Sequence, residues 1–323
     1  MTRRSPALLG TLFVVVLLAA GWLLLRPAEP LPPGLPGAIV FVSDRAGTPA
    51  LYWRRLPRDR ERRLTFGSEA VGEPAVSPDG TRVAFSMNGR IGVVAVASGE
   101  TRILTLGVDW KDAQPCWLPD GRRLVVSARR RVGEPAGLHL LVGAEPLPVG
   151  AERPLDPAGD GPVGRRPLTQ PRAGDDTSPT ASPDGAFVAF VRAEHLMRVD
   201  LADGRVRRLT GGFKRERSPR FLPSGRIACA WSEGKRHGID AIDAEGKSRE
   251  PITEGGAFYR TIAPSPDGRF FAATLTWDAG FRPLDALFGA PPEQVRLLDA
   301  SGREVARLEA SRRHANHSPD WGR

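Results

Sequence analysis

The sequence is poor in cysteine. Cys116 and Cys229 are the two cysteines among 323 residues, which excludes a disulfide-stapled scaffold and a cysteine-rich zinc module. Both fall in predicted strands that belong to non-adjacent repeats of the pattern described below, too far apart for a disulfide. We therefore expect two buried, unreactive thiols.

Lysine is also scarce, and the formal charge of +9 comes mainly from arginine. The arginines are scattered singly or in pairs, with acidic residues between them. A nucleic-acid-binding surface would need basic residues clustered in a patch or stripe. We expect a well-solvated, arginine-rich surface and no nucleic-acid partner.

The composition excludes a long-helix bundle or a coiled coil. The 36 glycines and 31 prolines make up about a fifth of the chain, and both residue types break helix interiors. With 41% hydrophobic and 26% charged residues, the chain resembles neither a disordered nor a multi-span membrane protein. Enough apolar residues remain for a sizeable core.

A long hydrophobic run occupies residues 7–25. At a rise of about 1.5 Å per residue it matches a bilayer core about 30 Å thick. The run continues through Trp22 to Leu25, past the small residues where cleavage would occur, and exceeds the about 7 to 15 apolar residues usual in signal peptides. We predict an uncleaved transmembrane signal anchor; cleavage would instead leave a secreted protein.

The residues on either side of this run suggest its orientation. Arg3 and Arg4 precede it, and the positive-inside rule places residues 1–6 in the cytoplasm and the rest outside. Residues 26–37 are rich in proline and are predicted to form a semi-rigid linker. Residues 38–323 then form one extracytoplasmic, periplasmic domain.

After residue 38 a Pro-Asp-Gly-like turn recurs with a base period near 41 residues, which is typical of four-stranded propeller blades. Proline fixes φ, aspartate bonds back to amides of the turn, and glycine accepts a positive φ. Insertions lengthen two of the intervals. The six turns are predicted at 77–80, 118–121, 182–185, 222–225, 265–268 and 318–322.

The segments between these turns also repeat. An apolar, β-rich run such as 82–85 follows a turn and predicts a second strand. A third strand leads to a second turn, such as Ser98-Gly99, and a fourth strand ends in a Leu-Thr or Ile-Thr pair, such as Leu64-Thr65. The interval from that threonine to the next turn proline is 13 or 14 residues in all five instances. This constant phase predicts four-stranded antiparallel blades.

The two ends of the repeat complement each other. Residues 316–321 supply a first strand and a turn, whereas 38–42, 51–56 and 61–65 supply three further strands. Together they form a sixth blade, which closes the ring and removes the exposed edges of the sheet. The sequence therefore predicts an all-β, six-bladed β-propeller, which we expect to be monomeric.

The Ser-Pro-Asp-Gly turn, the strand that leads into Ser43-Asp44-Arg45 and the Leu-Thr pair resemble the repeat of TolB-type six-bladed propellers. The resemblance covers residues 38–323. TolB itself carries an additional N-terminal α/β domain, and here the anchor and linker occupy that place. The resemblance implies an architecture, whereas a function must come from a site.

The Pro-Asp-Gly turns lie on one face of the predicted ring. The opposite face collects the loops from second to third strands and the loops from each Leu-Thr pair to the next first strand. Its aromatic and arginine content is typical of protein interfaces, so we predict a partner-binding face; a hydrated polar rim is the alternative. The selected site residues are Asp109, Trp110, Lys111, Lys214, Arg215, Arg217, Phe258, Tyr259, Arg260, Phe281, Phe288 and His314. The same loops contain Glu69, Glu73, Asp112, Arg172, Asp175, Asp176, Glu216, Arg312 and Arg313.

Two insertions interrupt the repeat. Residues 143–165 are rich in proline and are expected on the side of the Pro-Asp-Gly turns. Residues 278–293 are expected on the candidate face, and the spacing of Phe281, Leu284 and Phe288 is helical. This second insertion is predicted either to pack onto its own blade or to form a cap or docking knob at the channel.

Signals of catalysis are weak. No Gly-x-Ser-x-Gly elbow, phosphate-binding glycine loop, His-Glu-x-x-His or Cys-x-x-Cys pair occurs. His237, His314, His317 and Asp109 are conceivable metal ligands, because a site needs three or four converging groups. Scattered, structurally satisfied histidines are the favoured interpretation, so we predict no catalytic residue, no metal and no cofactor.

These patterns predict a membrane-anchored, extracytoplasmic propeller that is a non-enzymatic binding scaffold. The expected partner is another envelope protein or a cell-wall component. Two alternatives remain: a metal-dependent, lyase- or cyclase-like propeller enzyme, and a sensor that binds a glycan or small molecule at the channel mouth.

Overall fold

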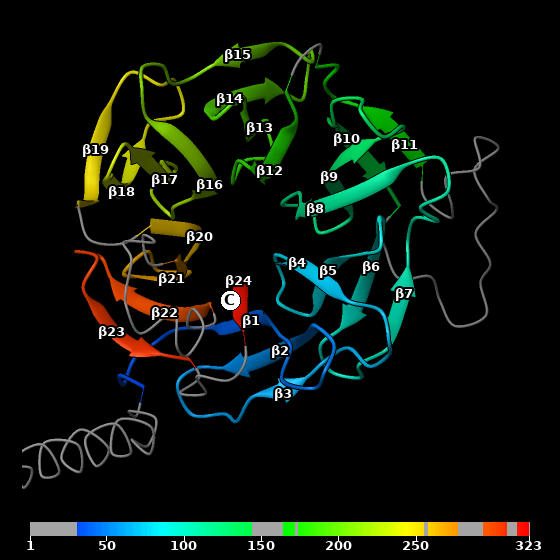
Figure 1. The fold of residues 1–323 in the computed structure, drawn as a ribbon, viewed down its shortest axis with the longest axis vertical. Coiled ribbons are helices and arrows are strands. Elements are labelled where there is room, and N and C mark those ends of the chain that lie inside the picture. The colour runs from blue at the N-terminus through cyan, green and yellow to red at the C-terminus, as the bar shows by residue number, and fades with distance from the viewer. Residues whose placement is uncertain are drawn as a thin grey trace, which may run out of the picture.

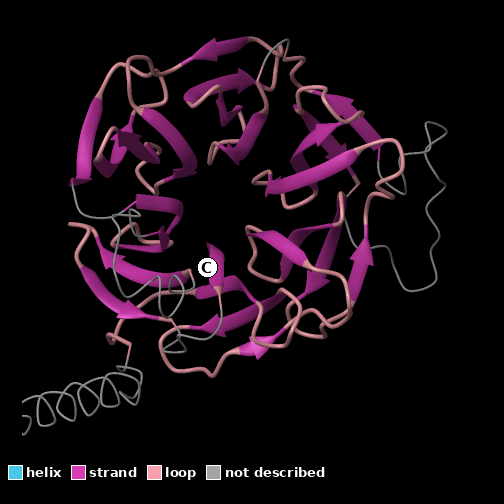
Figure 2. Cartoon of the chain, in the orientation of Figure 1, coloured by secondary structure: helices cyan, strands magenta, loops and turns pink. Residues whose placement is uncertain are grey.

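The structure is a computed structural model that describes residues 31–143, 164–171, 174–254, 258–276, 293–308 and 315–322. These residues form strands, turns and loops (Figure 2). Within them there is no helix of the length and apolar character needed to span a membrane. The predicted anchor at 7–25 and the first part of the linker at 26–37 lie outside the described residues.

Six four-stranded antiparallel sheets surround a central axis, and each sheet is one blade whose strands run in order from the innermost outward (Figure 1). Blade 1 has β24 (Asn316–Gly322), β1 (Ala38–Ser43), β2 (Ala50–Arg55) and β3 (Arg62–Arg63). Blade 2 has β4 (Val71–Val76), β5 (Arg82–Met87), β6 (Arg90–Ala95) and β7 (Thr101–Ile103). Blade 3 has β8 (Lys111–Trp117), β9 (Arg123–Arg129), β10 (Gly137–Val142) and β11 (Gly164–Pro167).

The remaining blades repeat this order. Blade 4 has β12 (Asp176–Ala181), β13 (Phe187–Arg192), β14 (His195–Asp200) and β15 (Val206–Arg208). Blade 5 has β16 (Arg215–Phe221), β17 (Ile227–Glu233), β18 (Arg236–Ile242) and β19 (Arg249–Glu254). Blade 6 has β20 (Phe258–Pro264), β21 (Phe270–Thr276), β22 (Gln294–Asp299) and β23 (Glu304–Arg307). The prediction of a six-bladed propeller is confirmed.

The Pro-Asp-Gly turns between first and second strands form as the sequence predicts. In blade 4, the N–H of Gly185 donates to the carbonyl of Ser182 at 2.9 Å, and Gly185 has a φ of 70°. Asp184 Oδ1 accepts from the Ser182 hydroxyl at 2.5 Å and from the Ala186 N–H at 3.0 Å. These two bonds lower the pKa of Asp184, because they stabilise its charged form.

The Leu-Thr pairs stabilise the blades from within. Thr65 Oγ1 accepts the backbone N–H of Leu51 at 3.0 Å, and Thr105 Oγ1 accepts that of Ile91 at 2.9 Å. The equivalent threonines of blades 3, 4 and 5 make the same bond to their own third strand. Leu64, which precedes Thr65, is buried in the core. One residue of the pair therefore satisfies a buried backbone group and the other fills the core.

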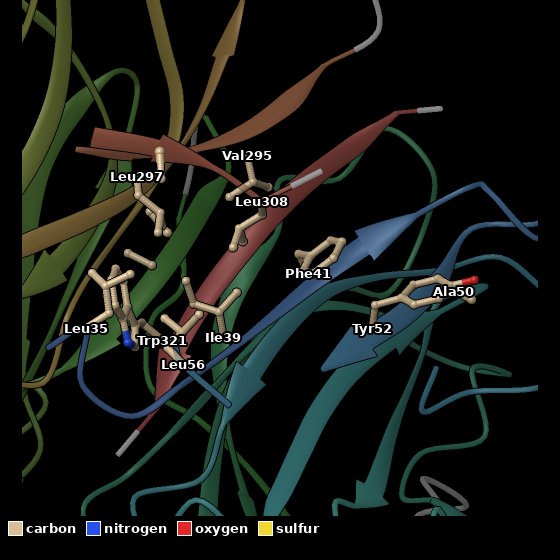
Figure 3. Close-up of a cluster of buried hydrophobic side chains, with 13 residues drawn as sticks. Leu35, Ile39, Phe41, Ala50, Tyr52, Leu56, Val295, Leu297, Leu308 and Trp321 are labelled. Atoms are coloured by element: carbon tan, nitrogen blue, oxygen red, sulfur yellow. The ribbon is translucent and has the colours of Figure 1, made fainter. Parts of the chain in front are cut away.

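The ring closes as predicted, by pairing the C-terminal strand with the N-terminal strands. β1 lies between β24 and β2, with Ile39 opposite Trp321 and Arg54. Trp321 is 8% exposed and packs in a cluster that joins blade 1 to blade 6 (Figure 3). Its indole Nε1 donates to the carbonyl of Pro36 at 2.8 Å. Leu35, just before β1, belongs to the same cluster, so the closure is both hydrogen-bonded and apolar.

The predicted sixth turn at 318–322 is wrong. These residues lie within β24, which pairs with β1 as far as Gly322. Ser318 has a φ of 50° before Pro319, a conformation that Ser178 before Pro179 and Ser218 before Pro219 share on the inner strands of blades 4 and 5. Pro319 is therefore equivalent to the prolines that lie within the inner strands of other blades, such as Pro179, and not to the prolines of the turns. We call these the inner-strand prolines.

Both cysteines are free. Cys229 lies buried in β17, as predicted, whereas Cys116 in β8 is only half-buried. Burial raises the pKa of the Cys229 thiol, which keeps it protonated and poorly reactive.

Candidate functional site

The connections between strands give the propeller two different faces. The Pro-Asp-Gly turns and the second glycine turns share one face, as shown by the Val96 N–H that donates to the Thr81 carbonyl. We call this the turn face. On the opposite side, the Asp112 N–H donates to the Gly89 carbonyl at 2.9 Å, so loops into first strands meet hairpins between second and third strands. We call that side the mouth face; its described segments are 44–49, 66–70, 88–89, 106–110, 130–136, 168–171, 174–175, 193–194, 211–214 and 234–235.

The two insertions leave the blades on these opposite faces. The first connects β10 to β11 on the turn face, and the second connects β21 to β22 on the mouth face. Residues 144–163 and 277–292 lie outside the described part of the chain. Phe281 and Phe288, with their predicted helical spacing, belong to the second of these ranges, and His314 also lies outside the described residues.

Exposed apolar side chains concentrate on the mouth face. Six large hydrophobic side chains of the described residues are exposed. Phe66 is 76% exposed and Phe213 is 88% exposed. Five of the six lie on the mouth face, namely Phe66, Leu106, Val108, Val132 and Phe213. None of the five is among the predicted site residues, although the apolar residue directly after Thr65 and after Thr105 is a signal in the sequence.

The inner strands line a central cavity of about 260 Å³. Four of the six inner strands place a proline in its lining, namely Pro74, Pro115, Pro179 and Pro319, and β16 has Pro219 at the same position of the repeat. The residue before each of these prolines has a positive φ of about 50°, at a bulge of the strand. Blade 6 is the exception, because Thr261 is followed by Ile262. Each inner strand therefore contributes two or three residues around this position to the cavity lining.

Hydrogen bonds connect neighbouring inner strands around this cavity. The N–H of Gln114 donates to Glu73 Oε2 at 2.9 Å, and the N–H of Ser178 donates to Gln114 Oε1 at 2.7 Å. Between blades 5 and 6, the N–H of Ile262 donates to Ser218 Oγ at 3.0 Å. In each case the side chain of the residue before the inner-strand proline accepts a hydrogen bond from a backbone N–H of the next blade. These polar groups therefore connect neighbouring blades as well as line the cavity.

Arg217 and Phe258, both predicted site residues, are brought together at the mouth end of the channel. The Arg217 guanidinium lies 4.1 Å from the centroid of the Phe258 ring and donates to Ser232 Oγ at 2.6 Å. His237 packs edge-on against the same ring at 5.3 Å between centroids. Burial lowers the pKa of Arg217, since its charged form loses water. Arg260, from the neighbouring β20, lines the same cavity.

Lys214 and Arg215 have partners within the propeller. Lys214 Nζ lies 2.8 Å from Asp240 Oδ2 and 3.6 Å from the Trp231 ring centroid. Arg215 is exposed and pairs with Glu194 at 3.3 Å. Lys214 is therefore largely committed to the structure of blade 5, whereas Arg215 remains accessible.

The three predicted site residues at 109–111 belong to a separate part of the mouth face, at blade 3. Asp109 and Lys111 are exposed, and Lys111 Nζ donates to the Gly107 carbonyl at 2.7 Å. Trp110 is half-buried and packs on His139, with 4.4 Å between ring centroids. A pocket of about 550 Å³ lies beside this pair.

The prediction that Tyr259 belongs to the binding face is wrong. Its side chain is 4% exposed and belongs to the core between blades 5 and 6. Alternation along β20 explains this placement, because Phe258 and Arg260 point to the other side of the strand from Tyr259.

His139 gives a testable pH dependence. Burial and the nearby Arg165 lower its pKa to about 4, whereas an unfolded histidine titrates near 6.5. The unfolded chain then binds more protons between these values, so stability falls as the pH drops from about 6.5 to 4. The change is about 3 kcal/mol, from about 1.4 kcal/mol per pKa unit. We expect His139→Gln to flatten this part of a stability–pH profile measured by urea unfolding; an unchanged slope would show that His139 does not titrate on unfolding.

Metal-binding capacity is not evident in the described residues. They contain no group of three or more His, Cys, Asp or Glu side chains that could hold a metal ion. His317 Nδ1 lies 3.0 Å from Ser318 Oγ, and burial lowers the pKa of His317.

Comparisons with known proteins agree with this architecture. No protein-family model matches the chain. The chain is 31% identical over 175 residues to the Protein TolB homolog of Chlorobium luteolum, a match that covers 52% of this chain and 35% of that protein. It therefore spans about a third of the length of that relative.

Solved structures show the same fold. TolB from Acinetobacter baumannii is similar with a TM-score of 0.68 and 17% identity, over 90% of this chain and 68% of that chain. An oligogalacturonate lyase in complex with manganese is similar with a TM-score of 0.58 and 15% identity, over 85% of this chain and 77% of that chain. The protein is a six-bladed β-propeller that is similar to TolB, as the repeat indicated. Because an enzyme shares this fold, the fold alone does not distinguish binding from catalysis.

Proposed function

We propose that the protein is a non-enzymatic binding scaffold of the cell envelope, which holds a partner protein or a cell-wall component on its mouth face. The observation that carries the proposal is the concentration of exposed apolar side chains on that face, including Phe66 and Phe213. Exposed apolar surface that gathers on one side of a domain is typical of interaction sites.

Arginine and aromatic side chains add to this surface. Arg215 and Arg260 are exposed near the channel, with side chains 66% and 62% accessible. Arginine and aromatic residues contribute disproportionately to binding energy at protein interfaces. A partner that covers Phe213 and the channel mouth would therefore gain both apolar burial and ionic contacts.

The proposed location is the periplasmic side of the membrane. It rests on the hydrophobic run at 7–25, on the arginines before it and on the proline-rich linker at 26–37. The similarity to a TolB homolog supports a role in the envelope. In this arrangement the linker would hold the propeller away from the bilayer.

Site-specific photo-crosslinking in cells tests this proposal with the full-length protein. A photoreactive residue at Phe66 or Phe213 on the mouth face is expected to form a discrete adduct with one partner. The same residue at Asp120 or Asp267, exposed on the turn face, is the matched control and is expected to form none. Phe213→Ala should reduce recovery of that partner about 10-fold, in line with a hot-spot contribution of about 1.4 kcal/mol or more.

Two outcomes would contradict the scaffold. One is equal or absent crosslinking at both faces. The other is stoichiometric metal in the purified protein together with turnover of a substrate, which would establish an enzyme.

A further inference from the structure

The charged residues at the channel mouth are distributed unevenly around the ring. The residue two positions before the inner-strand proline differs in charge from blade to blade. In blade 6, Ile262 stands in place of that proline. In blades 2, 3 and 4 the residue two positions earlier is Gly72, Ala113 or Thr177, and in blade 1 it is His317. In blades 5 and 6 it is Arg217 or Arg260. Three of the six blades thus have a small, uncharged residue at this position, whereas two adjacent blades have an arginine. We call Arg217 and Arg260 the basic arc.

Arg217 forms no ion pair within the described residues, and Glu194, which acts on it at longer range, pairs with Arg215. Its contacts are the Ser232 hydroxyl and the Phe258 ring, and its buried Nη1 has no hydrogen-bond partner. The ring and the hydroxyl hold the guanidinium in one place, so little side-chain entropy remains to be lost when an anion binds. A half-buried cation without a counter-ion gains strongly from an added carboxylate.

The other charges of the cavity do not neutralise Arg217. Arg260 pairs with Glu293 at 2.5 Å but keeps 62% of its side chain exposed. Arg220 lies 3.8 Å from Asp320, whose Oδ2 also accepts the Val76 N–H. Glu73 is on blade 2, opposite blade 5 in the ring, and its carboxylate accepts from Ser86 Oγ and from the Gln114 N–H. Among the described residues, the cavity lining therefore carries three arginines and one glutamate.

The size of the cavity limits what can enter it. About 260 Å³ lies below the about 300 to 1,000 Å³ of typical small-molecule sites. A few side chains of an extended segment fit such a space, whereas a folded domain would remain on the mouth face outside it.

We propose that the basic arc receives an acidic peptide segment of the partner, with carboxylates placed against Arg217 and Arg260. This inference rests on the proposed function, and it adds the chemistry by which the partner is recognised. The partner's body covers the exposed apolar residues around the mouth, and its acidic segment enters the channel. Arg260 exchanges its contact with Glu293 for the incoming carboxylate.

Fluorescence polarisation with a labelled hexaglutamate peptide tests the proposal on the full-length protein in detergent. We expect binding that weakens as salt is raised, and at least 10-fold weaker binding for Arg217→Gln and for Arg260→Gln. Arg260→Gln is the safer variant for folding because that side chain is mostly exposed. Arg269→Gln is the matched control: it removes an equal charge from blade 6, its side chain is 66% exposed on the turn face, and the change should alter the affinity less than twofold. Hexalysine should not bind.

The result that overturns the proposal is an equal effect of all three variants, which would mean attraction by the net charge alone. Binding of inorganic phosphate at Arg217 without binding of hexaglutamate would also overturn it and define a small-anion site. If a partner crosslinks to Phe213 and its recovery is unchanged by Arg217→Gln and Arg260→Gln, the acidic-segment proposal fails while the scaffold function stands. If no partner crosslinks, the scaffold function fails.

Discussion

Replacing Trp321 with alanine is expected to destabilise the propeller by about 3 to 5 kcal/mol, the usual cost of removing a large buried aromatic side chain. Trp321 is 8% exposed and fills the cluster between blades 1 and 6 with Ile39 and Leu56 (Figure 3). The variant also leaves the Pro36 carbonyl without its indole donor. Both losses fall on the one blade that is assembled from the two ends of the chain. Urea unfolding at pH 7 measures the difference.

Phe213→Ala is the matched control for this experiment. Phe213 is 88% exposed, so its removal should change the free energy of unfolding by no more than about 0.5 kcal/mol. A loss below about 1 kcal/mol for Trp321→Ala would mean that ring closure contributes little to stability.

The second large effect is expected at the ion pair between Arg165 and Asp112. The two side chains are 5% and 0% exposed, and Arg165 Nη2 donates to both carboxylate oxygens of Asp112 at 3.0 and 2.8 Å. Arg165→Met leaves a buried carboxylate without its counter-charge, which costs about 3 to 5 kcal/mol. Urea unfolding of the single variant should show this loss directly.

A double variant separates the cost of an unpaired charge from the value of the pair. Adding Asp112→Leu to Arg165→Met should restore most of the stability, because apolar residues of similar size can replace a buried ion pair. As a control, Arg303→Ala removes an exposed partner of Asp299, with a side chain 79% accessible, and should cost less than about 1 kcal/mol. If the double variant is as unstable as the single one, packing by the Arg165 stem is the dominant contribution.

The sequence predicted the architecture well because each turn of the repeat depends on local chemistry. A proline, an aspartate and a glycine at fixed positions specify a turn without help from distant residues, as the bonds around Asp184 illustrate. The misplaced turn at Ser318-Pro319 arose from the same local rule. Blades 2 to 5 each have a second proline four residues before the turn proline, as Pro74 stands before Pro78. Only the pairing of β24 with β1 distinguishes the two.

The candidate site was less predictable, because it depends on contacts between blades. The alternation of loops sufficed to place Arg215 and Asp109 on the mouth face. The sequence could not indicate that Phe258 of blade 6 would lie against Arg217 of blade 5. It also could not indicate that Tyr259, one residue later, would enter the core. Periodicity locates a residue on a strand, whereas tertiary packing decides what that residue meets.

The joining of β24 to β1 has a consequence for the order of folding. Trp321 and Pro36 are 285 residues apart in sequence, and a ribosome synthesises the chain from the N-terminus. β1 is among the first strands to be synthesised, and the backbone groups along one of its edges have no partner strand until β24 is made. Contacts of such high sequence separation form late and slowly. A prematurely terminated chain would keep this edge of β1 unpaired. The unpaired edge would then distinguish an incomplete propeller from a complete one for cellular proteases and chaperones.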